Sequence, residues 1–182
     1  MSEAIDKRQT QALQARRENR LADARHDLLE ALALSRQAND RRALIHTLKA
    51  LGQIERDLGQ GDAALPLYEE AVYLCREEAD PLLLAHTIRH LGDIHLDAAR
   101  PALAEPCYHE ALALYRAHKQ TLPLDLANAV RPLAILKDDA GQVAEARQLW
   151  QEARDLYASV NIAQGVAESS RRLALLANRP TP

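Results

Sequence analysis

The sequence repeats itself at a spacing of 40 residues, and this periodicity restricts the fold more than any other feature. The segment that starts at Ala43 aligns with the segment that starts at Leu83, with small, aromatic and aliphatic residues at the same places. Self-similarity at a period of roughly 20–50 residues is the signature of a protein built from stacked repeats. The matched pairs are His46 and His86, Leu51 and Leu91, Gly52 and Gly92, Ile54 and Ile94, Ala64 and Ala104, Tyr68 and Tyr108, Ala71 and Ala111, and Leu74 and Leu114.

Further copies extend the pattern in both directions. A third copy follows at an offset of 42, with Leu133, Ala146 and Trp150 at the equivalent places. The upstream copy is degenerate, because Gln11 stands where the repeat has an aliphatic residue. We therefore predict one domain over residues 1–182, with repeats at approximately 3–40, 41–80, 81–120 and 123–160 and a capping helix at 162–177.

Each copy is predicted to form two antiparallel helices. Apolar residues recur at helical spacing in its first half, as at Leu44, Leu48 and Leu51, and again in its second half. The composition agrees, because Ala, Leu, Arg, Glu and Gln dominate, Phe is absent and β-branched residues are sparse. The fold class is therefore all-α, and we expect nine helices stacked as an α-solenoid.

The turns between these helices are legible in the sequence. Asn19, Gly59 and Gly141 occupy equivalent places, where the end of a helix needs a left-handed residue. Ala99 departs from this pattern. We expect the side chain of Asp62 to cap the helix that follows its turn.

Four prolines lie within or beside the expected helices. Pro66 and Pro106 are expected in the first turn of their helices, and Pro81 at a first helical position, where no intrahelical hydrogen bond is lost. Pro132 follows a stretch with a helical pattern, so it should kink its helix or delay the start of that helix.

Small and large residues alternate in the repeat. Gly52 and Gly92 let neighbouring helices approach closely, and the large residues Tyr68, Tyr108 and Trp150 are expected to fill the space between successive units. The same aromatic residues could form a stacking platform for nucleotides, as in RNA-binding proteins. Their fixed places beside alanines favour a role in the core.

The pattern of Leu51–Gly52 followed by Ala64, Tyr68 and Ala71 resembles the tetratricopeptide repeat, over roughly residues 5 to 177. The spacing of 40 to 42 residues exceeds the usual ~34 and is similar to the long-helix subclass of kinesin light chains and spindle-orientation adaptors. The resemblance implies a non-enzymatic scaffold whose first helices line a concave groove for an extended peptide or a partner helix. This sequence departs from the family pattern at two sites. The family's tryptophan is replaced by Leu48 and Ile88, and the proline that closes its second helix is replaced by Arg76 and Arg116.

Charge and motifs exclude several classes of function. The net charge of −3 provides no positive field for nucleic acid or an anionic membrane, so neither is expected as a partner. No apolar run exceeds five residues, which predicts no signal peptide and no membrane span. Cys75 and Cys107 fit no disulfide framework, so we expect a cytoplasmic protein.

Motifs for phosphate binding, hydrolase nucleophiles and metalloproteases are missing, which predicts no enzyme and no cofactor.

The candidate binding site is a column of cations on the first helices. Lys49, Arg89, Arg131 and Arg171 each stand two residues before an anchor leucine, and by the resemblance this column faces the groove. The guanidinium group suits carboxylates, so we predict a partner protein with an acidic segment or a free carboxylate. The neighbours one turn before or after the column complete the predicted groove, and they are His46, Gln53, His86, Asp93 and Asn128.

Three other interpretations of these residues stay open. The arginines could pair with nearby acids such as Asp93 and Asp97 rather than with a partner. His86, His90 and Asp93 fall on one helix face at spacings of four and three, which permits a metal site but fits a polar groove wall equally. The chain could instead be an assembly module that forms a homodimer. The sequence does not identify the partner.

Overall fold

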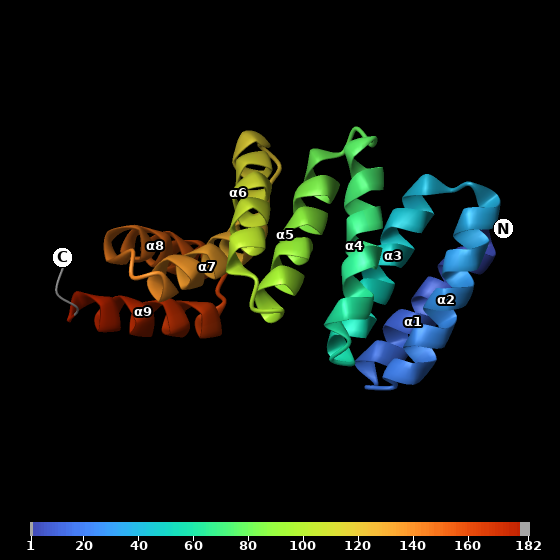
Figure 1. Ribbon diagram of the computed structural model, residues 1–182, viewed down its shortest axis with the longest axis horizontal. Coiled ribbons are helices and arrows are strands. Elements are labelled where there is room, and N and C mark those ends of the chain that lie inside the picture. Colours follow the sequence, from blue (N-terminus) through green and yellow to red (C-terminus); the bar gives the residue numbers. More distant parts are fainter. Residues whose placement is uncertain (1, 179–182) are drawn as a thin grey trace. The chain divides into compact units, whose positions relative to one another are not determined.

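The computed structural model describes residues 2–178, and every regular element in this part of the chain is an α-helix, as predicted. None of the helices within the described residues is both long enough and apolar enough to cross a membrane. The nine helices of residues 2–178 are α1 (Ser2–Arg17), α2 (Leu21–Ala38), α3 (Arg41–Asp57), α4 (Gly61–Arg76), α5 (Pro81–Asp97), α6 (Pro101–Ala117), α7 (Pro123–Asp139), α8 (Val143–Ser159) and α9 (Ala163–Ala177) (Figure 1).

The helices fall into two compact units. Unit 1 ends at Asp80 and holds α1 to α4, and unit 2 begins at Pro81 and holds α5 to α9. Within each unit, consecutive helices pack as antiparallel hairpins: α1 with α2 and α3 with α4 in unit 1, α5 with α6 and α7 with α8 in unit 2 (Figure 1). Helix α9 packs against α8. The single domain over residues 1–182 stays a prediction.

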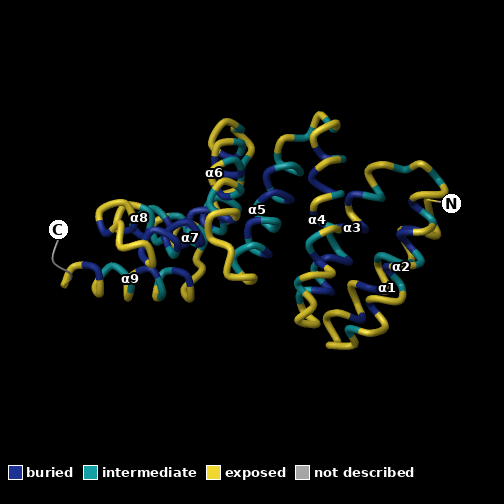
Figure 2. Tube along the Cα trace, viewed as in Figure 1, coloured by how far each residue is buried: buried dark blue, intermediate teal, exposed yellow. Residues whose placement is uncertain are grey.

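The core of each hairpin is built by an aromatic ring that covers a small residue. A Cβ atom on Gly52 would lie 2.6 Å from Cε2 of Tyr68, and one on Gly92 would lie 2.9 Å from Cε1 of Tyr108. Both tyrosine rings therefore lie on the glycine of their own hairpin, whereas we expected them between successive units. Trp150 does join neighbours, because it packs with Ala134 of α7 and with the buried apolar face of α9. Figure 2 shows buried residues along the inner sides of the hairpins and exposed residues at the turns.

The predicted turn residues adopt the left-handed conformation. Asn19, Gly59 and Gly141 have φ values of 58°, 74° and 72°. In the second of these turns the N–H of Gln60 donates to the carbonyl of Glu55 at 2.8 Å, which satisfies a carbonyl at the end of α3. Ala99 takes the same conformation, with φ of 54°, although its Cβ makes this conformation unfavourable.

Two details of the helix starts differ from expectation. Asp62 is the second residue of α4, whose N-cap is Gln60, and α4 has no side-chain cap. The expected cap was therefore wrong, and the Asp62 carboxylate instead lies in the first turn, where it interacts favourably with the helix dipole. Pro66 and Pro106 are each the sixth residue of their helices, one turn further in than expected, because α4 and α6 begin earlier.

Pro132 neither ends nor delays its helix. Helix α7 begins at Pro123, after the extended residue Leu122, and continues through Pro132 to Asp139. The predicted delay was wrong, because a proline at the first position fixes a helical φ and Pro132 is packed into the buried face of α7. Pro81 does begin α5, as predicted.

Candidate functional site

The predicted groove residues of unit 1 lie on α3. Lys49 and Gln53 are half-buried and His46 is exposed. The Gln53 amide donates a hydrogen bond of 2.8 Å to Asp57, whose other carboxylate oxygen accepts one of 2.6 Å from Arg16. The pKa of His46 is lowered by the protein packed around it and further by the positive charges of Lys49 and Arg42. His46 is therefore kept neutral near pH 7.

The predicted residues on α5 form one polar cluster in unit 2. Arg89 Nη1 lies 3.1 Å from Asp93 Oδ2, and its Nη2 lies 2.7 Å from Nε2 of His90. The other oxygen of Asp93 accepts a hydrogen bond of 2.9 Å from the Tyr108 hydroxyl on α6. The side chains of Arg89 and Asp93 are only 13% and 18% exposed, so this ion pair belongs to the interior of the hairpin.

The electrostatics of this cluster keep Asp93 ionised. Burial by itself would raise the pKa of Asp93, but hydrogen bonding from His90 and the charge of Arg89 lower the pKa below its usual value. Burial and the charge of Asp93 raise the pKa of Tyr108, so this hydroxyl stays protonated and donates. Burial also raises the pKa of Tyr115, to about 12.

The cation on α7 has a different setting. Arg131 donates from Nε and Nη2 to the two oxygens of Glu168 on α9, at 2.7 and 2.8 Å, in a two-point pair. The side chain of Arg131 is 40% exposed and that of Glu168 is 23% exposed, so this pair lies at the surface. Asn128, one turn earlier on α7, accepts a hydrogen bond of 3.1 Å from the Tyr157 hydroxyl.

The last cation of the column, Arg171, is exposed on α9, three residues beyond Glu168. Its charge and that of Arg172 help to lower the pKa of Glu168, after the larger effect of the hydrogen bond from Arg131. Arg172 itself is engaged, with Asp138 at 3.5 Å and the Trp150 ring centre at 5.8 Å.

The histidine cluster does not have the arrangement of a metal site. The rings of His86 and His90 meet edge to face at 4.6 Å, and Asp93 is held by Arg89 and Tyr108. Within residues 2–178 no group of three or more His, Cys, Asp or Glu side chains could hold a metal ion. The geometry favours the alternative of a polar wall at these residues.

Ion pairs also join the second helices of successive hairpins, α2 with α4 and α6 with α8. Arg36 pairs with both oxygens of Glu70 at 2.7 and 3.0 Å, and Arg116 pairs with both oxygens of Glu152 at 2.8 Å. Both pairs join second helices, and Arg116 stands where the family pattern has its closing proline. Such pairs at exposed sites contribute only ~0–1 kcal/mol each.

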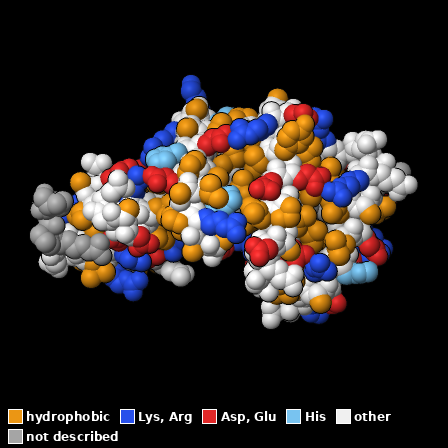
Figure 3. All heavy atoms as spheres, viewed as in Figure 1, with side chains coloured by type: hydrophobic (Ala, Val, Ile, Leu, Met, Phe, Trp, Pro, Cys, Tyr) orange, Lys and Arg blue, Asp and Glu red, His pale blue; other side chains and the backbone are white. Residues whose placement is uncertain are grey.

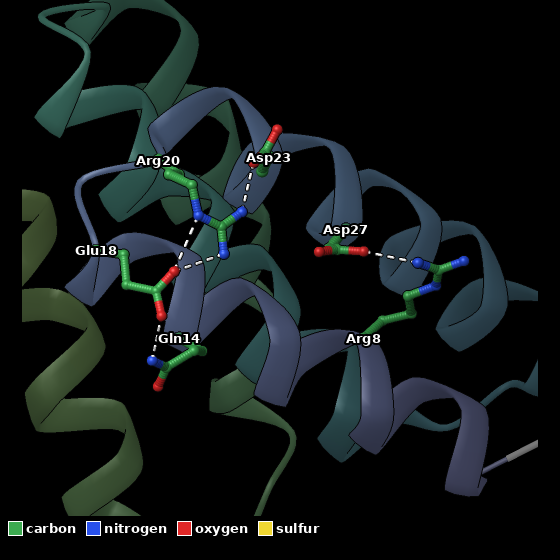
Figure 4. Close-up of polar contacts among 6 residues, drawn as sticks. All are labelled: Arg8, Gln14, Glu18, Arg20, Asp23 and Asp27. Atoms are coloured by element: carbon green, nitrogen blue, oxygen red, sulfur yellow. Dashed lines mark hydrogen bonds and ion pairs between the residues drawn. The ribbon is translucent and has the colours of Figure 1, made fainter.

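The first hairpin shows the same kind of contact. Arg8 of α1 reaches Asp27 of α2, while Arg20 in the turn contacts both Glu18 and Asp23 (Figure 4). Acidic and basic side chains are interspersed over the face shown in Figure 3, with hydrophobic side chains between them. A single arginine is therefore weak evidence for a binding site unless its setting differs from these structural pairs.

Sequence reasoning missed the hydroxyl groups of this site. Tyr108 and Tyr157 were expected only as core or left unassigned, yet both donate to polar residues of the first helices. A signal was present in the composition, because the chain has five Tyr and no Phe. A core that needs only aromatic volume would use both residues, so the bias was a signal for hydroxyl partners such as those of Tyr108 and Tyr157.

Comparison with known proteins identifies the repeat. The family model for the tetratricopeptide repeat matches residues 44–117. The matched part of the chain, from α3 to α6, is thus similar to the tetratricopeptide repeat. Proteins with tetratricopeptide repeats generally mediate protein–protein interactions.

One solved structure extends the likeness over most of the fold. It is a Signal Transduction ATPase with Numerous Domains protein with a tetratricopeptide repeat sensor, from Pyrococcus horikoshii. The match covers 91% of this chain at 16% identity with a TM-score of 0.78, and it spans 26% of the archaeal chain. At this identity the likeness concerns the fold alone. No curated protein matches the chain.

Proposed function

We propose that this chain is a non-catalytic scaffold that binds an acidic or carboxylate-bearing segment of a partner protein on the first helices of unit 2. The observation that carries the proposal is the setting of Arg131. Its guanidinium group is at the surface and already holds a carboxylate at two points, at 2.7 and 2.8 Å. A partner carboxylate would use the same geometry.

The two arginines in the middle of the column contribute differently to this proposal. Arg89 is 13% exposed and is held by Asp93 within its own helix, so it supports the wall of the site from inside. Arg131 and Arg171 are reachable from solvent. The predicted groove residues of each unit remain proposals in their own right, and Arg131 is the main anchor in unit 2.

Capture of the partner tests the proposal. The full chain is immobilised and exposed to lysate from its native source, as wild type and as Arg131→Glu. The control is Arg116→Glu, because Arg116 also pairs with both oxygens of a glutamate, Glu152, through its Nη2, but lies on the second helix of its hairpin. We expect loss of the captured protein for Arg131→Glu alone, and weaker capture as salt rises. Capture that survives Arg131→Glu, or that ignores salt, would contradict the proposal.

The cellular location and the oligomeric state are separate predictions. Fractionation of native cells tests the predicted cytoplasmic location, and light scattering on the purified chain tests for a homodimer. A dimer that forms at low micromolar concentration would favour the assembly-module alternative.

A further inference from the structure

The pair between Arg131 and Glu168 has a feature that the other two-point pairs lack. Glu168 occupies the repeat column of Asp6, His46, His86 and Asn128, in which no other residue of unit 2 is acidic. In unit 2 this acid therefore lies on α9 and faces Arg131 of α7, whose side chain is 40% exposed compared with 13% for Arg89. Glu168 is therefore placed where the carboxylate of a partner would bind.

The attachment of α9 makes this contact exchangeable. Helix α9 packs against α8, and two ion pairs join it to α7, Arg131 with Glu168 and Arg172 with Asp138. Glu168 is 23% exposed, so its carboxylate is partly open to solvent. Asp93, by contrast, is held from two helices.

The charges that remain when Glu168 moves away from Arg131 favour an anion. Arg131 would lose its only acid contact among the described pairs, and Arg171 projects from the same turn of α9 as Glu168. Arg172 stays engaged by Asp138 and Trp150. The open site would thus present two guanidinium groups, from α7 and α9, to one carboxylate.

We propose that Glu168 is a built-in competitor that occupies the Arg131 site until a carboxylate of the acidic partner displaces it. This inference rests on the proposed function. The exchange replaces one carboxylate with another on the same guanidinium, so the competitor weakens binding only moderately. Exposed ion pairs are weak, and we therefore expect release of Glu168 to raise affinity about two- to fivefold, which corresponds to ~0.4–1 kcal/mol.

A defined probe tests this without knowledge of the partner. Fluorescein-labelled hexaglutamate with a free carboxyl terminus is titrated with the full chain at low ionic strength, and anisotropy gives the dissociation constant. Glu168→Gln should bind about two- to fivefold more tightly than wild type. Adding Arg131→Gln to Glu168→Gln should abolish the gain.

The control for net charge is Glu152→Gln. This variant removes the same charge and frees Arg116, whose Nη2 contacts both oxygens of Glu152, but both residues lie on the second helices of their hairpins. An equal gain with Glu152→Gln would overturn the inference, because the effect would then be general. A second result would also overturn the inference: wild type and Glu168→Gln bind the probe equally, and Arg131→Gln abolishes binding by both. That result would leave the acidic-partner proposal standing. If hexaglutamate binds neither chain, an opened Arg131 does not accept carboxylates and the inference fails, whereas partner capture still tests the scaffold.

Discussion

Glycines at the centre of the first helices show how single residues set the packing of a hairpin. Gly52 lies in α3, where glycine costs ~0.5–1 kcal/mol relative to alanine. The cost is accepted because a Cβ there would lie 2.6 Å from the ring of Tyr68, which is 1% exposed and enclosed on all sides. The close approach of α3 and α4 therefore depends on the absence of one methyl group.

Replacing this glycine tests the packing directly. Gly52→Ala should lower the free energy of unfolding by about 1–2 kcal/mol, because overpacking outweighs the gain in helix propensity. Gly61→Ala is the control, since a Cβ at Gly61 meets nothing within 4 Å. Urea denaturation measures both variants. Equal stability of Gly52→Ala and wild type would show that the Tyr68 ring does not lie on this glycine.

Ala99 is a residue whose conformation opposes its chemistry. Its φ of 54° is the left-handed conformation that Gly59 and Gly141 adopt in the equivalent turns. Ala99→Gly should therefore raise the free energy of unfolding by roughly 0.5–1 kcal/mol. Ala98→Gly has no such strain to relieve and should give no gain. A thermal melt that ranks the two variants in the opposite order would contradict the assigned turn.

At the scale of the helix, the second helices rely on alanines at close crossings. Ala71 and Ala111 are both 0% exposed and occupy equivalent places in α4 and α6. Ala111→Leu should destabilise the chain by about 1–3 kcal/mol, because the added atoms have no space. Ala113→Leu, on the exposed side of α6, is the matched control. Thermal melts in which both variants behave alike would place Ala111 away from a close crossing.

The ion pair that attaches α9 to α7 should weaken as the pH falls. The hydrogen bond from Arg131, followed by the charges of the nearby arginines, lowers the pKa of Glu168 below its ordinary value of 4.5. A depressed pKa stabilises the folded state above the ordinary value, and this stabilisation is lost as pH falls through the folded pKa. Stability measured between pH 6 and pH 3 should therefore fall less steeply in Glu168→Gln than in wild type. Equal dependence of stability on pH in wild type and Glu168→Gln would contradict the ion pair between Arg131 and Glu168.

For the whole molecule, the repeat predicted the element order well because local periodicity and turn chemistry encode it. Hairpins, the left-handed turns at Asn19, Gly59 and Gly141, and the start of α5 at Pro81 all follow from residues close together in the sequence. The passage of α7 through Pro132 was not predictable in this way, because burial of that proline decides it.

The candidate site was less predictable than the fold. The column of cations is visible in the sequence, but the partner of each cation is not. Arg89 pairs within its own helix, as the ion-pair alternative anticipated, whereas Arg131 reaches Glu168, 37 residues further along the chain. Only the packing of α9 brings Arg131 and Glu168 together. The spacing of the cations in the sequence therefore could not distinguish the buried pair of Arg89 from the more exposed pair of Arg131.

The central claim is that a partner with an acidic segment binds along the first helices of unit 2, next to Arg131. A photo-crosslinking amino acid at Gln164, which is exposed on α9 four residues before Glu168, tests it in native lysate. The same group at the exposed position Ala113 on α6 reports on the second helices. We predict that mass spectrometry finds a cross-linked acidic peptide of one partner at Gln164 and none at Ala113. The same peptide at both positions, or cross-links at Ala113 alone, would contradict the account.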